Sequence, residues 1–479
     1  MHESDKTRRE FLARMTSSAG LLFGPTGVAS INAGDDADLR GPADVVLRIA
    51  PVQLEIAPGR TITTVAYNGT VPGPLIRFRE GVNATVDIFN DTDAAEYVHW
   101  HGFDVPTDVD GAEEEGSLAV PARGRLRYRI VPLPSGCRYV HTHAMSMSDL
   151  NRGAFTGQFA FAHIEPKTNP GRYDQEIFLA THEWEPFLTS VEEQEDSSPQ
   201  QPLPGHKSMD TNPHGWEVDY RHFTINGRCL GHGEPIRVKE GQTVLFHFLN
   251  ASATNSVRFA LPGHRFEVVA LDGNPVPHPQ LVDVLELGTA ERIDAVVLMD
   301  APGIWILGTP MDRRREKGMG IVVEYANRTG KPRWVKPPND SWDYTIFGKN
   351  RSVPQPHEVI PLVIGHISGG KGAFDQWTIN GKGYDAQGQP TRLAKGKRHR
   401  LVFDNQTDDV HPVHIHRTSF ELTNVYGKPT SGVMKDVVMV QGNQKIEVDV
   451  TPLMEGLTLF HCHQQLHMDY GFKMLFNVI

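Results

Sequence analysis

A three-fold internal repeat constrains the fold of this 479-residue chain more than any other feature. Each copy contains an Asn-Gly dipeptide, which favours the tight turn of a β-hairpin. The dipeptides are Asn68-Gly69, Asn226-Gly227 and Asn380-Gly381, at intervals of 158 and 154 residues. Each copy continues with a second turn that ends in glycine and, nine residues later, an asparagine: Gly81 and Asn90, Gly241 and Asn250, Gly396 and Asn405.

The segments between these glycines and asparagines have the pattern of β-strands. Apolar and polar residues alternate there as in a half-buried strand, for example over 243–249. The 45 glycines and 34 prolines also suit a turn-rich β protein better than a helical one. Since a chain of this length exceeds what one hydrophobic core supports, we predict several domains. The fold class is all-β, with three related Greek-key β-sandwich domains over 44–166, 172–327 and 340–479.

Charge and cysteine content exclude some classes of protein. The net charge of -11 leaves no basic surplus to neutralise phosphates, which argues against a nucleic-acid partner. Three cysteines cannot form a disulfide framework. Two of them, Cys137 and Cys229, could pair across the first and second domains or remain buried thiols, and their spacing does not decide between these alternatives.

The N-terminal segment has the pattern of an export signal. Residues 7–12 read Thr-Arg-Arg-Glu-Phe-Leu, a twin-arginine pattern, and a weakly apolar stretch follows over 15–29. We interpret residues 1–38 as a twin-arginine signal peptide, which predicts a periplasmic or secreted protein exported by the twin-arginine translocase. The alternative is a frayed basic terminus. No later segment is long and apolar enough to span a membrane, so we expect no membrane insertion after signal removal.

Four His-x-His pairs are the strongest chemical signal among the 23 histidines: His99 and His101, His141 and His143, His414 and His416, His461 and His463. On a strand, residues i and i+2 point to the same face, so each pair presents two imidazoles side by side. Two pairs fall in the first predicted domain and two in the third. We therefore expect eight imidazoles to converge where these domains meet, as a group of metal ions requires.

The repeat also locates a difference between the three copies. Nine residues beyond the repeated asparagine, the first and third copies have His99 and His414, whereas the middle copy has Phe259. The middle domain is therefore interpreted as a spacer that kept the fold and lost the metal site.

A cysteine in the last histidine pair predicts a second kind of metal site. Strand alternation turns Cys462 away from the face that carries His461 and His463. His411 has the parity that turns it toward the same side as Cys462, and His467 follows the cysteine by five residues. Two imidazoles and one thiolate are the ligands of a blue copper centre.

These motifs resemble those of the multicopper oxidases, over most of the chain that follows the signal. The resemblance implies cupredoxin-like domains and four copper ions that pass electrons from a reductant to dioxygen, which is reduced to water. It assigns the type 1 copper to His411, Cys462 and His467, and the type 2 copper to His99 and His414. It assigns the two type 3 coppers to His101, His141, His143, His416, His461 and His463.

At the family's axial position the sequence departs from the pattern. Ten residues after the cysteine, where some members have a methionine ligand, stands Phe472. We expect Phe472 to be the axial neighbour of a three-coordinate type 1 copper, which raises the reduction potential. Met474 and Met468 are nearby alternatives that need a shifted backbone.

Proton delivery to dioxygen calls for carboxyl groups near the copper cluster. Asp110 matches the family's acid beside the type 2 copper; its alternative is a turn aspartate before Gly111. The positions of a second family acid are Gln465 and Met468, which cannot relay protons, so Asp469 is the remaining candidate.

The substrate follows less directly from the sequence. The 13 methionines form no dense cluster of the kind that accompanies oxidation of cuprous ion, and the closest approach is Met145-Ser146-Met147. We therefore expect a laccase-like oxidase of phenols and aromatic amines, with Cu(I) or Mn(II) as the alternative reductant. A copper protein without turnover is a further alternative. A metal-free cupredoxin scaffold predicts missing histidines, whereas the full set is present.

Overall fold

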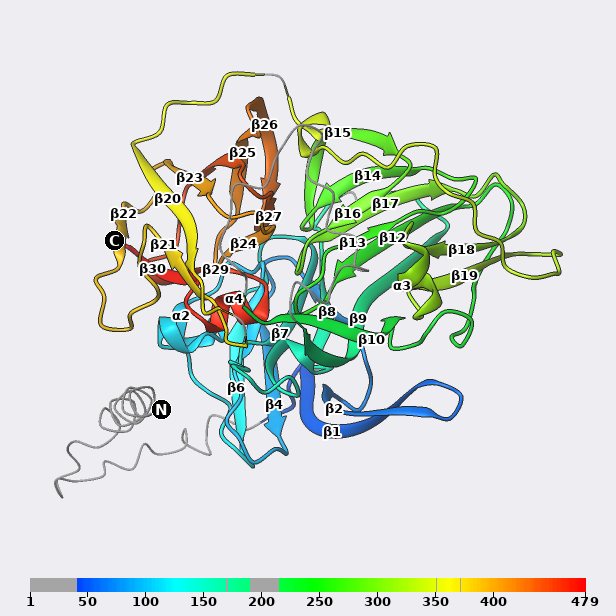
Figure 1. Ribbon diagram of the computed structural model, residues 1–479, viewed down its shortest axis with the longest axis horizontal. Helices are drawn as coiled ribbons and strands as arrows, with labels where there is room; N and C mark the ends of the chain where they lie inside the picture. The colour runs from blue at the N-terminus through cyan, green and yellow to red at the C-terminus, as the bar shows by residue number, and fades with distance from the viewer. Residues whose placement is uncertain (1–40, 169–170, 190–214, 350, 371) are drawn as a thin grey trace, which may run out of the picture. The chain divides into compact units, whose positions relative to one another are not determined.

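The computed structural model describes residues 41–168, 171–189, 215–349, 351–370 and 372–479. The predicted signal peptide, residues 1–38, lies outside them. Over these ranges the chain is built almost entirely of β-strands, so the predicted all-β fold class is confirmed. Within them, no helix combines the length and the apolar character needed to cross a bilayer. We use the predicted ranges 44–166, 172–327 and 340–479 to name the first, second and third domains, and each sheet draws its strands from one of them (Figure 1).

The first domain pairs two four-stranded sheets. One has the order β2 (Arg60–Tyr67), β1 (Val45–Ala57), β4 (Ala84–Asn90), β6 (Arg125–Ile130). The other has the order β3 (Ile76–Arg79), β8 (Phe159–Glu165), β7 (Gly136–Thr142), β5 (Val98–His101). Short helical turns connect the strands: α2 (Thr107–Asp110), η1 (Glu113–Glu115) and η2 (Gly153–Phe155).

The second domain is organised around a six-stranded sheet with the order β10 (Glu217–Ile225), β9 (Gln175–Thr189), β12 (Thr243–Asn250), β17 (Arg292–Leu298), β14 (Phe266–Leu271), β15 (Asn274–Val282). Smaller sheets join β11 (Ile236–Val238), β19 (Gly320–Tyr325) and β18 (Ile304–Gly308), and β13 (Val257–Phe259) with β16 (Leu285–Leu287). Helix α3 (Asp312–Glu316) precedes β19.

The third domain has a six-stranded and a five-stranded sheet. The first has the order β21 (Gln376–Ile379), β20 (Glu358–Ile367), β23 (His399–Asn405), β28 (Lys445–Val450), β25 (Phe420–Val425), β26 (Lys428–Lys435). The second has the order β22 (Thr391–Leu393), β30 (Lys473–Val478), β29 (Gly456–Cys462), β24 (His411–Ile415), β27 (Val437–Val440). Helical turns are η4 (Tyr344–Phe347) and α4 (Gln465–Asp469).

The repeated Asn-Gly turn has the same atomic structure in all three domains. Each asparagine adopts a left-handed backbone, with φ of 52°, 49° and 54° at Asn68, Asn226 and Asn380. Its side-chain oxygen accepts a hydrogen bond from the backbone of the domain's first strand, at 2.6 Å from Arg48 N, 2.8 Å from Ala180 N and 2.8 Å from Val363 N. The repeat is therefore maintained by one turn and one hydrogen bond.

The second repeated asparagine is buried at the end of β4, β12 and β23. In the middle copy, the Asn250 amide donates to the carbonyls of Asn255 and Leu287 at 2.8 and 3.1 Å. Its oxygen accepts from Thr181 Oγ1 and Ser252 N at 3.0 and 3.2 Å. Asn90 and Asn405 make corresponding bonds to the loops that follow them. One side chain thus closes the loop that leads to the next strand.

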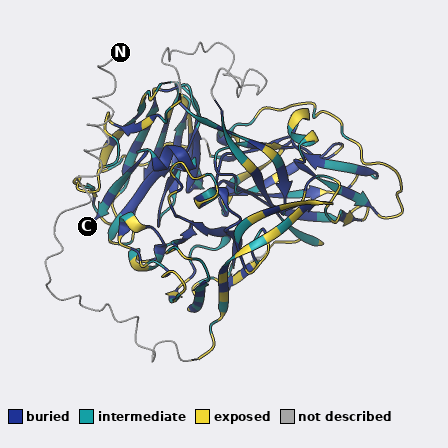
Figure 2. Cartoon of the chain, turned by 60° about the horizontal axis from the view of Figure 1, so that its bottom comes forward, coloured by how far each residue is buried: buried dark blue, intermediate teal, exposed yellow. Residues whose placement is uncertain are grey.

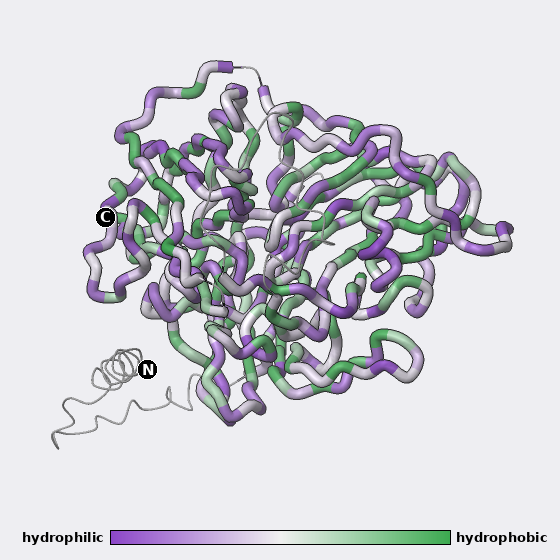
Figure 3. Tube along the Cα trace, viewed as in Figure 1, coloured by the Kyte–Doolittle hydropathy of each residue, from purple (hydrophilic) through white to green (hydrophobic). Residues whose placement is uncertain are grey.

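Alternating side chains build the core between the sheets. Strands β4 and β23 show strict alternation of buried and partly exposed residues, and apolar and polar segments alternate along the trace in Figure 3. Strand β24 is buried along its whole length, and buried segments, in dark blue, fill the interior in Figure 2. Phe259, which stands in the middle domain where the others have a histidine, is buried and lies 5.3 Å from the ring of Phe248. An aromatic pair fills the space that the imidazoles occupy elsewhere.

We predict that Asn250→Ala lowers the free energy of unfolding by about 2–4 kcal/mol, because it leaves the buried carbonyl group of Leu287 and the part-buried one of Asn255 without their donor. Urea denaturation at a fixed copper content measures the effect. Asn151→Ala, at an exposed position, serves as the control and is expected to change stability by less than about 0.5 kcal/mol. Equal stability of both variants would contradict the closing role of Asn250.

Candidate metal centre

Antiparallel pairing places the histidine pairs side by side within each domain. In the first domain, β5 pairs with β7 so that His99 lies opposite His141. In the third domain, β24 pairs with β29 so that His414 lies opposite His461. The same arrangement in both domains gives two facing sets of four imidazoles.

The two sets interleave. The His99 ring stacks on that of His416 with centroids 3.9 Å apart, and the His101 ring stacks on that of His414 at 3.8 Å. Ligand atoms of several triplets lie within 4.8 Å of one another: His99, His414 and His416; His99, His101 and His141; His143, His416 and His461. The structure thus brings together the eight histidines that the sequence predicted to converge, and all are buried.

Burial keeps these imidazoles in the form that binds metal. Desolvation lowers the pKa of His461 to about 3, and lowers the pKa of the others for which a shift is resolved: His101, His141, His143, His414, His416 and His463. A neutral imidazole offers a lone pair to a cation. His143 Nε2 is buried and has no hydrogen-bond partner among the described residues, as expected of an atom that faces a metal ion.

Asp110 contacts the cluster directly. Its Oδ2 lies 2.7 Å from His416 Nδ1 and 3.3 Å from His99 Nδ1, and its backbone oxygen accepts from His99 Nδ1 at 2.9 Å. These acceptors hold the proton on Nδ1 of both rings, so that Nε2 faces the cluster. The aspartate therefore does more than form a turn before Gly111.

Sequence reasoning missed a second carboxyl group beside Asp110. Glu115 Oε1 lies 3.4 Å from His416 Nδ1 and accepts from Leu459 N at 2.6 Å. Burial, with the nearby Asp110 charge, raises the pKa of Glu115 well above its usual range. It lies on η1, within a run of three glutamates that looks like an exposed acidic turn. No spacing rule identifies it.

Asp436 is a further carboxyl group that the sequence did not predict, and it orients His101 and His414. Its Oδ1 accepts from His101 Nε2 at 3.0 Å, which leaves His101 Nδ1 facing His141 Nε2 at 3.4 Å. Its backbone oxygen accepts from His414 Nδ1 at 2.7 Å. Arg292 in turn holds both carboxylate oxygens of Asp436 at 2.6 Å. The partner that selects the His101 ligand atom thus comes from a distant part of the sequence.

His411, Cys462 and His467 form the separate cluster that strand parity predicted. Cys462 Sγ lies 3.7 Å from His411 Nδ1 and 3.6 Å from His467 Nδ1, and all three residues are buried. Thr407 Oγ1 lies 2.9 Å from His411 Nε2 and holds that ring with Nδ1 toward the thiol. Burial raises the pKa of Cys462, so the thiolate needs a cation to form.

Aromatic rings cover this second cluster. Phe472 is fully buried, with its ring 5.0 Å from that of His411. The Trp377 ring lies 4.0 Å from that of His467. These contacts make the surroundings of the Cys462 thiol apolar.

Asp469 and the two remaining cysteines lie apart from these clusters. Asp469 Oδ2 accepts from Ser146 N, Ser146 Oγ and Met147 N at 2.9, 2.8 and 2.7 Å, and Oδ1 accepts from Gln465 at 2.9 Å. It therefore fastens the loop after His143 to helix α4. Cys137 and Cys229 are buried free thiols, not a disulfide.

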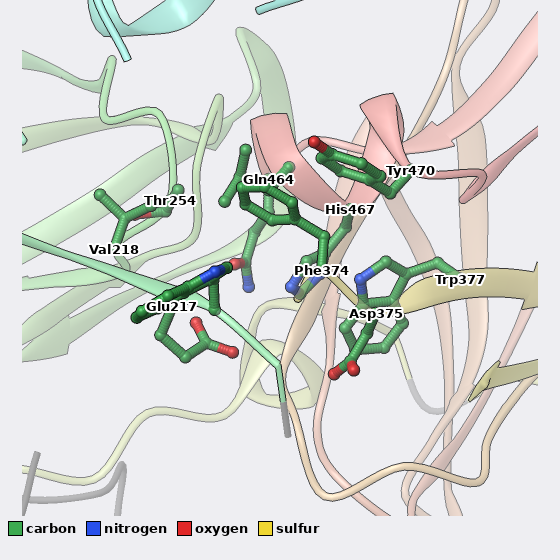
Figure 4. Close-up of a pocket in the computed structure, with 11 residues that line it drawn as sticks. Glu217, Val218, Thr254, Phe374, Asp375, Trp377, Gln464, His467 and Tyr470 are labelled. Carbon is green, nitrogen blue, oxygen red and sulfur yellow. The ribbon is translucent and has the colours of Figure 1, made fainter. Parts of the chain in front are cut away.

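A pocket opens at the edge of the second cluster (Figure 4). His467 and Trp377 lie against it, together with the aromatic rings of Tyr470 and Phe374. Its other lining residues are Trp216, Glu217, Val218, Thr254, Asp375, Gln464 and Leu466. The walls therefore come from the second and third domains, and they combine aromatic faces with two carboxyl side chains.

Three family models described as multicopper oxidase match residues 48–169, 199–326 and 361–479. The chain belongs to the multicopper oxidase family and is an oxidoreductase that uses dioxygen.

Its similarity to individual proteins is moderate but extends over most of the chain. The multicopper oxidase MmcO of Mycobacterium tuberculosis is 28% identical over 441 residues, which are 88% of this chain and 84% of that relative. Copper resistance protein A of Pseudomonas syringae pv. tomato is 26% identical over 347 residues, 65% of this chain and 55% of the relative. The crystal structure of laccase from Botrytis aclada shares the fold, with a TM-score of 0.72 and 18% identity over 91% of this chain and 88% of that one.

The lowered histidine pKa values predict acid instability of the copper-free protein. Below about pH 6.5 these histidines bind protons in the unfolded chain but not in the folded cluster. The stability is therefore complete above this pH and lost as the pH falls toward the folded pKa, about 3 for His461. Each such histidine removes about 1.4 kcal/mol per pH unit.

Urea denaturation of copper-free protein at pH 7.5 and pH 5.5, followed by circular dichroism, measures this loss. The copper-loaded protein is the control, because bound metal opposes protonation of its ligands. Equal stability of the copper-free protein at both pH values would contradict the assignment.

Proposed function

We propose that this protein couples one-electron oxidation of phenols or aromatic amines to reduction of dioxygen. His411, Cys462 and His467 would hold the type 1 copper, and His99 and His414 the type 2 copper. The type 3 pair would be held by His101, His141, His143, His416, His461 and His463. When bound, these coppers would supply one-electron transfer from the reductant and the four-electron reduction of dioxygen to water.

Two carboxyl groups are placed to move protons at the cluster. Asp110 contacts His416 and His99, and Glu115 lies against Asp110 and His416. Asp110 Oδ1 and Glu115 Oε2 are buried without a hydrogen-bond partner among the described residues, which leaves both atoms available to accept a proton. Asp469 is a second proposed relay: it makes no direct hydrogen bond to the cluster histidines, but burial raises its pKa and its Oδ2 accepts from Ser146, three residues after His143.

The observation that carries the substrate class is the pocket against His467. Tyr470 already stacks on Phe374 with ring centroids 4.4 Å apart, so a phenol or an aromatic amine would bind at the mouth of the pocket, where His467 lies between this lining and the Cys462 thiol. A phenol or an aromatic amine loses a proton as it loses an electron. Asp375 and Glu217, in the same lining, supply carboxyl groups that can take it.

A metal-ion reductant is the second candidate. The same two carboxyl groups suit Mn(II), a cation that prefers oxygen ligands. Cu(I) is the other metal-ion candidate, because a relative is named a copper resistance protein. We further propose export through the twin-arginine route, on the pattern of residues 7–12.

Absorption spectroscopy and oxygen uptake of the copper-reconstituted protein test the proposal. We expect an intense visible band from the Cys462 thiolate, absent in Cys462→Ser and retained in Cys229→Ser. Oxygen uptake should be faster with a phenol than with Cu(I), and Asp375→Asn should raise KM for the phenol roughly tenfold. A band without oxygen uptake would overturn the oxidase, whereas faster uptake with Cu(I) would favour the metal-ion candidate.

Phe472→Met tests the axial position. A thioether donor stabilises Cu(II) relative to Cu(I), so the type 1 reduction potential should fall while the visible band persists. A redox titration followed at this band measures the change. An unchanged potential would show that the side chain at 472 does not face the metal; Phe476→Met, at a buried position on β30, is the matched control.

A further inference from the structure

Metal-ligating side chains also gather where the first and second domains meet, away from both copper clusters. In the first domain, Cys137 on β7 lies opposite His163 on β8. In the second domain, His247 on β12 lies opposite Asp294 on β17. The two cross-strand pairs face each other, since the rings of His163 and His247 are 5.2 Å apart. Four potential ligands therefore come from four strands of two domains.

His247 is the centre of this group. Its Nδ1 lies 2.7 Å from Asp294 Oδ1, and its Nε2 lies 3.1 Å from Glu176 Oε1 on β9. The Cys137 thiol is hydrogen-bonded to the His247 imidazole, and burial together with the charge of Asp294 raises its pKa. Phe178 stacks on the His247 ring at 4.3 Å and fixes its plane.

The group is buried and one of its ligand atoms is unused. The exposed fractions are 0% for Cys137, 2% for His247, 6% for Asp294 and 9% for His163. His163 Nδ1 is buried and has no hydrogen-bond partner among the described residues. Since buried polar atoms are normally paired, this nitrogen indicates a missing partner at the cluster.

We propose that Cys137, His163, His247 and Asp294 bind one zinc ion. One thiolate, two imidazoles and one carboxylate are a tetrahedral zinc ligand set. His247 would bind through Nδ1, and its Nε2–H would remain on Glu176, which is the carboxylate–histidine–metal arrangement of many metal sites. Arg77 pairs with Glu176 and balances its charge.

Charge balance favours a divalent ion over Cu(I). A divalent ion bound by the Cys137 thiolate, the Asp294 carboxylate and two neutral imidazoles forms a neutral group. A monovalent ion leaves an uncompensated negative charge in a buried site, which is costly. The proposal does not depend on the function of the copper sites.

Metal analysis of the copper-loaded protein, dialysed against micromolar zinc, tests the proposal. We expect one zinc per chain beyond the coppers, lost in Cys137→Ser and in Asp294→Asn. Cys229→Ser, which removes the other buried thiol outside the copper sites, should retain it. X-ray absorption at the zinc edge should show one sulfur at about 2.3 Å and lighter ligands at about 2.0–2.1 Å.

Proton release gives a second, independent measurement. Because the Cys137 thiol must lose its proton as the ion binds, the apparent dissociation constant should fall at least about tenfold from pH 6 to pH 7. Zinc should also raise the melting temperature of the natural protein but not of Cys137→Ser. No bound zinc, zinc retained in Cys137→Ser, or copper in place of zinc would overturn the proposal. Normal copper content and oxidase activity in Cys137→Ser separate this outcome from a failure of the proposed function.

Discussion

The buried ion pair between Arg292 and Asp436 is the interaction on which the arrangement of the copper site depends. Arg292 begins β17 of the second domain, and Asp436 lies between β26 and β27 of the third. Arg138 of the first domain reaches the same carboxylate at 3.4 Å, so the three domains meet at one charge. Removing either partner would leave a buried charge uncompensated, at a cost of about 3–5 kcal/mol. The carboxylate also holds His101, which links domain docking to the geometry of the site.

Docking of the first and third domains brings the imidazoles of the two sets close together. Charged rings would repel one another, and burial lowers the pKa of seven of these histidines, which keeps their rings neutral. The stacking of His99 on His416 and of His101 on His414 then becomes a packing contact between domains. The site is thus part of the interface, and it is complete only when the first and third domains are docked.

The sequence predicted what depends on local spacing. The repeated turns at Asn68, Asn226 and Asn380 gave the all-β repeat, and strand parity separated Cys462 from its neighbouring histidines. The residues that orient the rings could not be predicted, because Asp436 and Glu115 reach their histidines through tertiary contacts over several hundred residues. No periodic pattern in the sequence indicates such a contact. Asp110 was found through the family motif, and its bond to His416 shows how it acts.

The middle domain has a structural role at the site although it has a phenylalanine where the other two domains have a histidine ligand. Phe259 marks the loss of the histidine site, which suggested a spacer. Strand β17 of this domain nevertheless carries Arg292 and, two residues on, Asp294. Side chains at this spacing share one face of a strand. This face meets the first domain: Arg292 Nε lies 3.4 Å from the backbone oxygen of Cys137, which belongs to that domain. One strand of the middle domain therefore positions the carboxylate behind His101 and contributes a ligand to the proposed zinc site. Through Arg292, the middle domain thus helps to determine how the first and third domains meet.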